Sequence, residues 1–140
     1  MAEAILRHLG GDAFEALSAG SHPAGFVHPL AIEVLRRLEI PLGDPVSKSW
    51  NEFARDAVDV VITVCDYAAA EVCPVWPGDP IKAHWSLPDP AYHGGSEEEC
   101  LEFALRVAKR LHAKIEGLVQ LDWSSPRRDI ERRLAFLAEI

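Results

Sequence analysis

The sequence has no long apolar run, few cysteines and no excess of positive charge. Nowhere in its 140 residues is there a stretch close to the roughly 18 consecutive apolar residues that a membrane-spanning helix needs. The first residues do not show a signal-peptide pattern, so we expect a cytoplasmic protein with no membrane partner. The net charge of −8 also argues against nucleic acid as the main partner, because phosphate backbones select basic surfaces.

Three cysteines are too few, and odd in number, for a stable disulfide framework in a reducing compartment. Such cysteines are buried apolar residues, metal ligands or reactive thiols. A metal site formed by Cys65, Cys73 and His84 is disfavoured, because structural zinc needs four closely spaced ligands and no second pair is visible. We therefore expect no metal and no bound cofactor.

The sequence also lacks a glycine-containing loop whose backbone amides could surround an oxyanion next to a reactive cysteine. Cys100 and Arg106 match the spacing Cys-x5-Arg, but no glycine lies between them and both fall inside a strongly patterned helix. Helical amides are already hydrogen-bonded and cannot bind an anion. We interpret this match as chance, and the sequence leaves open whether the chain is an enzyme by itself.

Helical and extended patterns alternate along the chain, and no internal repeat is visible. The predicted elements, in order, are a helix over 2–9, a strand over 13–19, a helix from 29 to about 39, a buried strand over 59–64, a short strand near 81–83, a long helix after Ser96 and a last helix from Ser125-Pro126. This alternation predicts a single α/β domain over residues 1–140, a three-layer sandwich around a mostly parallel sheet.

In an open parallel sheet, ligands bind beyond the carboxyl ends of the strands. Cys65 follows the predicted strand 59–64 directly, so its position favours a functional role. Cys73 follows eight residues later, and the two sulfurs could form a disulfide if the intervening chain brings their Cα atoms within about 7 Å. The spacing fits two buried structural thiols equally well.

Asp89 lies between Pro88 and Pro90. The following proline keeps its backbone extended, so the carboxylate projects from a stiff loop. This rigidity suits a general acid, which must hold its proton at a fixed distance from a leaving group. The same placement is also typical of a solvated turn aspartate.

Taken together, these residues resemble the arsenate reductases built on the low-molecular-weight tyrosine phosphatase fold. The matching segments cover the chain from its first residue to about residue 120, and the Cys-Pro-Val-Trp-Pro-Gly block is specific. These segments are Met1-Ala2-Glu3-Ala4, Ser18-Ala19-Gly20, His28-Pro29, Ser47-Lys48-Ser49, Thr63-Val64-Cys65-Asp66, Cys73-Pro74-Val75-Trp76-Pro77-Gly78, Ala83-His84-Trp85 and Asp89-Pro90-Ala91.

The resemblance implies a three-thiol relay. In the family, a cysteine at the start of the first helix attacks arsenate, and an aspartate matching Asp89 protonates the leaving oxygen. A cysteine matching Cys65 then attacks the adduct and releases arsenite, and in one branch a cysteine matching Cys73 closes a disulfide with it. The implied partners are a small oxyanion such as arsenate or phosphate and an external thiol reductant, either thioredoxin, or glutathione or mycothiol with a glutaredoxin.

The sequence departs from the family at its amino end. The family's Cys-x5-Arg loop and the central strand before it lie upstream of the residue that matches Met1. We therefore expect an arsenate reductase-like domain that is truncated at its amino terminus, lacks the first central strand and is inactive as the 140-residue chain. Two alternatives are a non-catalytic paralogue that binds a thiol or redox partner through Cys65 and Cys73, and a low-molecular-weight tyrosine phosphatase relative.

Loss of a central strand predicts self-association. If four of its side chains are core, the lost burial is on the order of 6–12 kcal/mol, comparable with the stability of a whole domain. We expect that the chain repacks, exchanges segments or forms homo-oligomers, and a monodisperse monomer in light scattering would contradict this expectation. Arsenate-dependent thiol turnover that survives substitution of Cys100 would contradict the expected inactivity.

Overall fold

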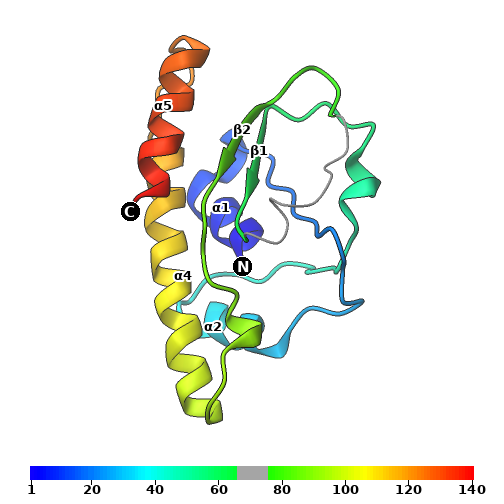
Figure 1. The fold of residues 1–140 in the computed structure, drawn as a ribbon, viewed down its shortest axis with the longest axis vertical. Coiled ribbons are helices and arrows are strands. Elements are labelled where there is room, and N and C mark those ends of the chain that lie inside the picture. The colour runs from blue at the N-terminus through cyan, green and yellow to red at the C-terminus, as the bar shows by residue number, and fades with distance from the viewer. Residues whose placement is uncertain (66–75) are drawn as a thin grey trace.

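The computed structural model describes residues 1–65 and 76–140 and has helices packed against a small parallel sheet (Figure 1). This arrangement confirms the predicted α/β class. The elements are α1 (Ala2–Gly10), η1 (Gly11–Ala13), α2 (Pro29–Arg37), η2 (Trp50–Phe53), β1 (Val60–Thr63), β2 (Ile81–His84), η3 (Pro90–Tyr92), α4 (Glu97–Val119) and α5 (Arg127–Ala138). Here η denotes a short 3-10 turn.

β1 and β2 run parallel, with Val60 opposite Ile81 and Thr63 opposite His84. Both were predicted, and the β-branched run of β1 explains why it forms a strand. The ladder continues past the assigned strands, because Trp85 donates its backbone N–H to Thr63 O at 2.8 Å and Leu87 to Val64 O at 3.0 Å. The two chain segments therefore leave the sheet side by side at its carboxyl end.

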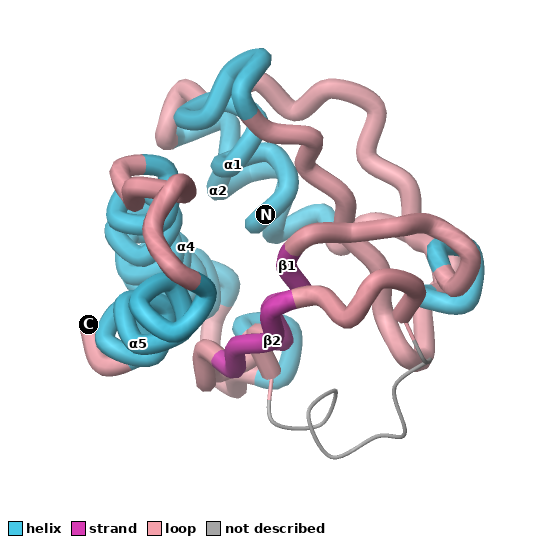
Figure 2. The backbone as a smooth tube through the Cα atoms, turned by 90° about the horizontal axis from the view of Figure 1, so that it is seen from above, coloured by secondary structure: helices cyan, strands magenta, loops and turns pink. Residues whose placement is uncertain are grey.

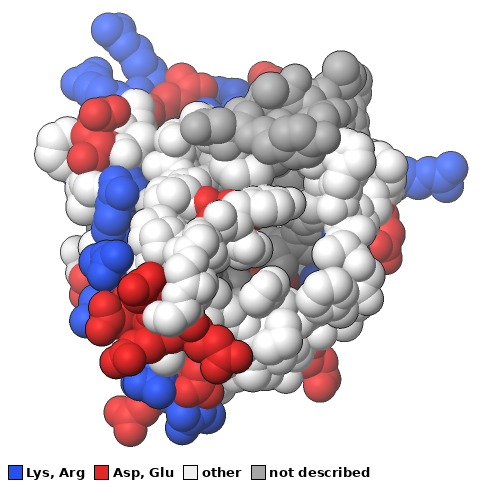
Figure 3. All heavy atoms as spheres, turned by 60° about the horizontal axis from the view of Figure 1, so that its bottom comes forward, with Lys and Arg blue, Asp and Glu red and all other residues white. Residues whose placement is uncertain are grey.

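The long helix α4 carries the main apolar stripe of the molecule. It begins at a capping box in which Ser96 Oγ accepts from Glu99 N and Glu99 in turn accepts from Ser96 N. The first turn of α4 contains three glutamates, which lie at the acidic end visible in Figure 3. Their negative charges stabilise the helix by interacting with the positive end of its dipole. Helices α1, α2 and α5 all pack against α4. None of the helices in residues 1–65 and 76–140 has the length and apolarity to cross a membrane.

The apolar periodicity of α4 predicts an inner stripe of Leu101, Leu105, Ala108, Leu111, Ile115 and Leu118. The last four are buried, whereas Leu101 and Leu105 are only partly buried. The buried residues of α4 are Ala104, Val107, Ala108, Leu111, Lys114, Ile115 and Leu118. The sequence pattern predicts Ile130, Leu134 and Leu137 as the inner face of the last helix, and all three are buried. The pattern over 29–39 predicts Ile32 on the inner face as well, but Ile32 is 38% exposed, because the buried residues of α2 are Val34 and Leu35.

Helix α5 crosses α4 closely at Gly117. A Cβ atom added to Gly117 would lie 2.4 Å from Leu137 Cδ2, closer than any real contact, so the small residue permits this approach. Near the crossing, the fully buried Lys114 donates from Nζ to the carbonyls of Leu137 at 2.8 Å and Ala138 at 2.7 Å. The lysine thus satisfies carbonyls at the end of α5, where a positive charge is favoured.

The predicted strand over 13–19 is wrong. Gly11–Ala13 forms a 3-10 turn, and residues 14–19 take no regular secondary structure. Only Gly20 joins a ladder, through an isolated parallel bridge to Ser49 in which Gly20 N donates to Lys48 O at 2.9 Å. A strand requires a neighbour to pair with, and within the described residues no strand pairs with residues 14–19.

Replacing Lys114 with methionine tests its capping role. We expect Lys114→Met to lower the free energy of unfolding by about 1.5–3 kcal/mol, because two charge-assisted hydrogen bonds to α5 are lost. The exposed Lys109 on the same helix provides the control, and Lys109→Met should stay within about 0.5 kcal/mol of the parent. Equal effects of both substitutions in urea unfolding would contradict the assigned role.

Candidate active site

Cys65 and Asp89 leave the sheet at the same end. Cys65 follows β1 and is half-buried. The hydrogen bond from Leu87 N to Val64 O fixes the two chain segments next to each other, one residue before Cys65 and two residues before Asp89. The structure therefore brings these two predicted site residues to the same end of the sheet, the carboxyl end of its strands, which we call this edge below. Cys73 lies outside the described residues, and its pairing with Cys65 stays a prediction.

The carboxylate of Asp89 is held by the backbone that follows it. Asp89 is the N-cap of η3, and its Oδ1 accepts from Ala91 N at 2.9 Å. Pro90 occupies the first position of the turn, which explains why a short turn forms directly after Asp89. One oxygen is thus anchored on an exposed, ordered loop, as the flanking prolines predicted.

Thr63 and His84 form a polar pair at this edge that the motif analysis missed. They are opposite each other in the ladder, and Thr63 Oγ1 lies 2.7 Å from His84 Nδ1. The sequence analysis weighed His84 as a metal ligand and within a family-matching segment, but not as a partner of Thr63. The described part of the chain has no group of three or more His, Cys, Asp or Glu side chains suited to a metal ion. The parallel register could not be predicted without knowing that the two strands pair.

Cys100 lies near the start of α4. Its thiol donates to the carbonyl of His93 at 3.3 Å, and its own backbone N–H is bonded to Ser96 O at 2.9 Å. The amide needed for an anion-binding loop is therefore engaged in the helix, as expected. The structure supports the interpretation of the Cys100–Arg106 spacing as chance.

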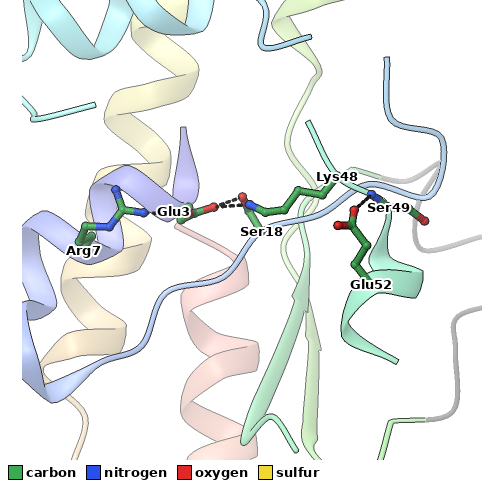
Figure 4. A network of polar contacts seen from close by, with 6 residues as sticks. All are labelled: Glu3, Arg7, Ser18, Lys48, Ser49 and Glu52. Atoms are coloured by element: carbon green, nitrogen blue, oxygen red, sulfur yellow. Dashed lines mark hydrogen bonds and ion pairs between the residues drawn. The ribbon is translucent and has the colours of Figure 1, made fainter. Parts of the chain in front are cut away.

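A carboxylate near the start of α1 joins three chain segments (Figure 4). Glu3 accepts from Arg7 at 2.6 Å, from the hydroxyl of Ser18, and from Lys48 Nζ at 3.3 Å. Partial burial alone would raise the pKa of Glu3, but the hydrogen bond from Ser18 and the charge of Lys48 outweigh it and lower that pKa. No local pattern signals this network, although Glu3, Ser18 and Lys48 fall in segments that carry the family resemblance.

The amino terminus lies beside the carboxyl end of β1 in Figure 1, and it is also near β1 in the view from above in Figure 2. Burial lowers the pKa of the Met1 amino group, partly offset by the charge of Glu3. The group also stands at the positive end of α1, where a cation is unfavourable and an anion is favoured. The start of α1 therefore lies near the carboxyl end of β1, the strand that Cys65 follows.

Residues 1–126 match the family described as low molecular weight phosphotyrosine protein phosphatase, and the chain belongs to that family. Its similarity to named relatives is more specific. An arsenate reductase of Halalkalibacterium halodurans is 30% identical over 120 residues, covering 86% of this chain and 85% of the relative. An arsenate reductase of Bacillus subtilis is 29% identical over 120 residues, with 86% and 85% coverage.

A solved structure agrees with these relatives. An arsenate reductase in the reduced state superposes with a TM-score of 0.63 at 25% identity, covering 84% of each chain. An arsenate reductase of Staphylococcus epidermidis is 34% identical over 116 residues, covering 83% of this chain and 82% of the relative. The resemblance to arsenate reductases of the low-molecular-weight phosphatase fold is thus confirmed.

Acid sensitivity should depend on Glu3. Because its pKa is lower in the folded protein, ionised Glu3 contributes stability above its ordinary value of 4.5, and this contribution is lost as the pH falls through the folded value. We expect Glu3→Gln to lower stability at pH 7 by about 1–3 kcal/mol and to flatten the loss between neutral and acidic pH. The exposed Glu116 on α4 gives a matched control, Glu116→Gln. If the stability of the Glu3→Gln variant fell with decreasing pH as steeply as that of the parent, Glu3 would not be the source of the acid sensitivity.

Proposed function

We propose that this protein contributes two groups to an arsenate-reducing thiol relay, with Asp89 as the acid of the first step and Cys65 as the attacking thiol of the second. The observation that carries this proposal is the Leu87 N to Val64 O hydrogen bond, which holds both residues at one edge of the sheet. The relatives named arsenate reductase supply the reaction class. Asp89 suits the acid role because one oxygen is anchored while the carboxylate remains exposed.

The proposed chemistry balances as follows. A first thiolate attacks arsenate, and Asp89 gives a proton to the departing oxygen, which leaves as water after a second protonation from solvent. The Cys65 thiolate attacks the sulfur of the resulting sulfur–arsenic bond, and the arsenic leaves with the bonding electrons as arsenite. Two thiols are oxidised to one disulfide and As(V) is reduced to As(III). Cys73 then attacks this disulfide, forms a Cys65–Cys73 disulfide and releases the first thiol.

The proposal includes an external reductant and a cytoplasmic location. The Cys65–Cys73 disulfide must be reopened by a thioredoxin-type protein, or by glutathione or mycothiol with a glutaredoxin-type protein. A reducing compartment keeps such a pool available. The substrate of the relay is a small tetrahedral oxyanion, arsenate.

We further propose that the 140-residue chain does not turn over arsenate alone. Cys65 is assigned the second step and Cys73 the third. The Cys100 thiol donates to the carbonyl of His93, and the backbone N–H of Cys100 is bonded to Ser96 O at the start of α4. None of the three is therefore assigned as the first nucleophile. Purified protein supplied with arsenate and either reductant system should show no arsenate-dependent reductant consumption, and turnover above a no-enzyme control would contradict this assignment.

The thiol half of the relay can be tested without arsenate. In a Cys100→Ser background, an aromatic disulfide reagent should react at Cys65, and Cys73 should displace the second aromatic thiolate, so that about two leaving groups appear per chain. In the Cys73→Ser, Cys100→Ser double variant, about one should appear and the mixed disulfide should persist. Peptide mass mapping should locate the product between Cys65 and Cys73.

The controls separate the relay from ordinary thiol reactivity. In the Cys100→Ser protein, the first aromatic thiolate should be released in a fast phase that reports the reaction of Cys65. The Cys65→Ser, Cys100→Ser variant should lose this fast phase while keeping the same fold by circular dichroism. A fast phase that survives in this variant would contradict the role of Cys65. Release of a single leaving group by the Cys100→Ser protein would instead favour a non-catalytic thiol-binding role.

The role of Asp89 can be tested only in a protein that also carries the first nucleophile. We propose a chimaera that joins a strand and Cys-x5-Arg loop from an arsenate reductase relative to Met1. In it, Asp89→Asn should keep the oxygen that accepts from Ala91 N but lower arsenate turnover by about 10²–10⁴-fold. Disulfide exchange between Cys65 and Cys73 should be unchanged. Equal losses in both steps would show that Asp89 only supports the loop.

A further inference from the structure

Helix α5 holds strand β2 at both of its ends. Before β2, Arg127 Nη1 donates to the carbonyl of Asp79 at 2.8 Å, and Nη2 donates to the carbonyl of Pro80 at 3.2 Å. After β2, the ring nitrogen of Trp85 donates to Leu134 O at 3.0 Å. The helix and the strand also pack against each other (Figure 1). Strand β2 is therefore fixed to α5 from outside the sheet.

Arg127 uses every nitrogen of its guanidinium group in these contacts. Its Nε donates to Glu131 Oε1 at 2.8 Å on the same helix, and its Nη1 also lies 3.4 Å from the carboxylate of Asp79. A guanidinium group is planar and presents its donors in a fixed fork, whereas a lysine ammonium is a flexible point charge. Because Glu131 holds one side of the group, the two Nη atoms are oriented toward the chain before β2.

The segment that Arg127 binds is a tight turn with an unusual backbone. Gly78 and Asp79 have φ angles of 80° and 51°, so two consecutive residues are in the left-handed region. Glycine adopts this conformation freely, but it is less favourable for aspartate, which has a Cβ atom. The two bonds from Arg127 hold the carbonyl of Asp79 and the next one along the chain. Without these bonds, we expect the turn to adopt other backbone conformations and the chain to approach β2 from more directions.

A short stretch of chain connects this turn to one of the predicted site residues. Cys73, which lies outside the described residues, precedes Asp79 by six residues and is assigned the third step of the proposed relay. Six residues span at most about 20 Å, so the reach of Cys73 is limited by the place where Arg127 anchors the chain. How readily a tethered group meets its partner depends on the length and stiffness of the tether.

These contacts are additional to the domain that the family model describes. The family match covers residues 1–126, so it ends one residue before Arg127. The whole of α5 lies beyond it. The anchor before β2 is therefore formed between the family domain and a helix that follows it.

We propose that Arg127 is a positioning residue for the third step of the thiol relay. By fixing the turn at Gly78 and Asp79, it restricts the directions from which Cys73 can approach Cys65 and so speeds formation of their disulfide. This inference rests on the proposed relay. Arg127 contacts no reacting atom, and Cys65 follows the β1 ladder, so loss of Arg127 slows the reaction of Cys73 and not that of Cys65.

Release of an aromatic thiolate from one equivalent of an aromatic disulfide measures this step. In the Cys100→Ser protein, the Cys65 thiolate attacks the reagent and releases the first aromatic thiolate. The Cys73 thiolate then attacks the Cys65 sulfur, and the second aromatic thiolate leaves with the electrons of the broken S–S bond. Adding Arg127→Met should slow the second release by about two- to thirtyfold, the range typical of substitutions that act through packed neighbours. The first release should be unchanged.

Matched variants separate the carbonyl bonds from the charge. Arg132→Met removes the same charge from an exposed position of α5 that pairs with Asp129 at 3.0 Å, and both releases should keep the parent rates. Arg127→Lys keeps the charge without the fork geometry, and it should slow the second release less than Arg127→Met does. Asp79→Asn should match the parent, because it keeps the backbone carbonyls and loses only the ion pair of a side chain that is 88% exposed.

An equilibrium measurement tests the same role by a second route. A restricted approach of Cys73 to Cys65 favours their disulfide over the two free thiols, which lowers the reduction potential of the pair. Equilibration with reduced and oxidised dithiothreitol gives this potential, since the dithiol supplies the two electrons that reopen the disulfide. Arg127→Met should raise the potential by about 10–45 mV, which is the two- to thirtyfold change converted at roughly 30 mV per factor of ten.

The outcomes distinguish failure of this role from failure of the relay. A second release as fast in Arg127→Met as in the parent, or an unchanged potential, would overturn the role of Arg127 and leave the relay intact. Equal slowing of both releases would show a general loosening of the sheet and would also overturn it. A single release by the Cys100→Ser parent itself would contradict the relay, and the role of Arg127 with it.

Discussion

Burial of the apolar stripe of α4 is the contact on which the rest of the structure depends. The described sheet consists of two four-residue strands, which are too small to be stable by themselves. Helices α1, α2 and α5 each pack against α4, and the buried residues of all four helices form the main core together with Trp85 and Leu87. The helices therefore position the sheet, and not the reverse.

Trp85 connects the helical layer to the strands that carry the candidate active site. Trp85 is 1% exposed, and its ring nitrogen donates to Leu134 O on α5 at 3.0 Å. The same residue donates its backbone N–H to Thr63 O, so it ties both strands to the helical layer. Asp89 follows four residues later and Cys65 two residues after Thr63. Both inherit their place from a buried anchor, which suits groups that must meet a substrate at a fixed distance.

Local patterns predicted most of the fold because local chemistry determines those elements. The capping box at Ser96, the proline at the start of α2 and the apolar periodicity of α4 each specify a helix without outside help. The strand predicted over 13–19 failed for the opposite reason, since a strand exists only through its neighbour. For the candidate site, local positions after a strand and between prolines were enough to propose Cys65 and Asp89, but contacts between distant residues were not predictable. The Thr63–His84 pair and the Glu3 network depend on contacts across 21 and 45 residues, which no local pattern encodes.

Gly117 shows how local preference and tertiary packing can oppose each other. Glycine in the middle of a helix costs roughly 1 kcal/mol relative to alanine, so an isolated peptide with the α4 sequence would become more helical with alanine at this position. In the folded protein, the added methyl group would meet the buried side chain of Leu137 and push α5 outward. The bonds from Lys114 and Trp85 to α5 would lengthen with it. A residue that weakens its own helix therefore sets the spacing between two helices, and through Trp85 it reaches the edge that carries Cys65.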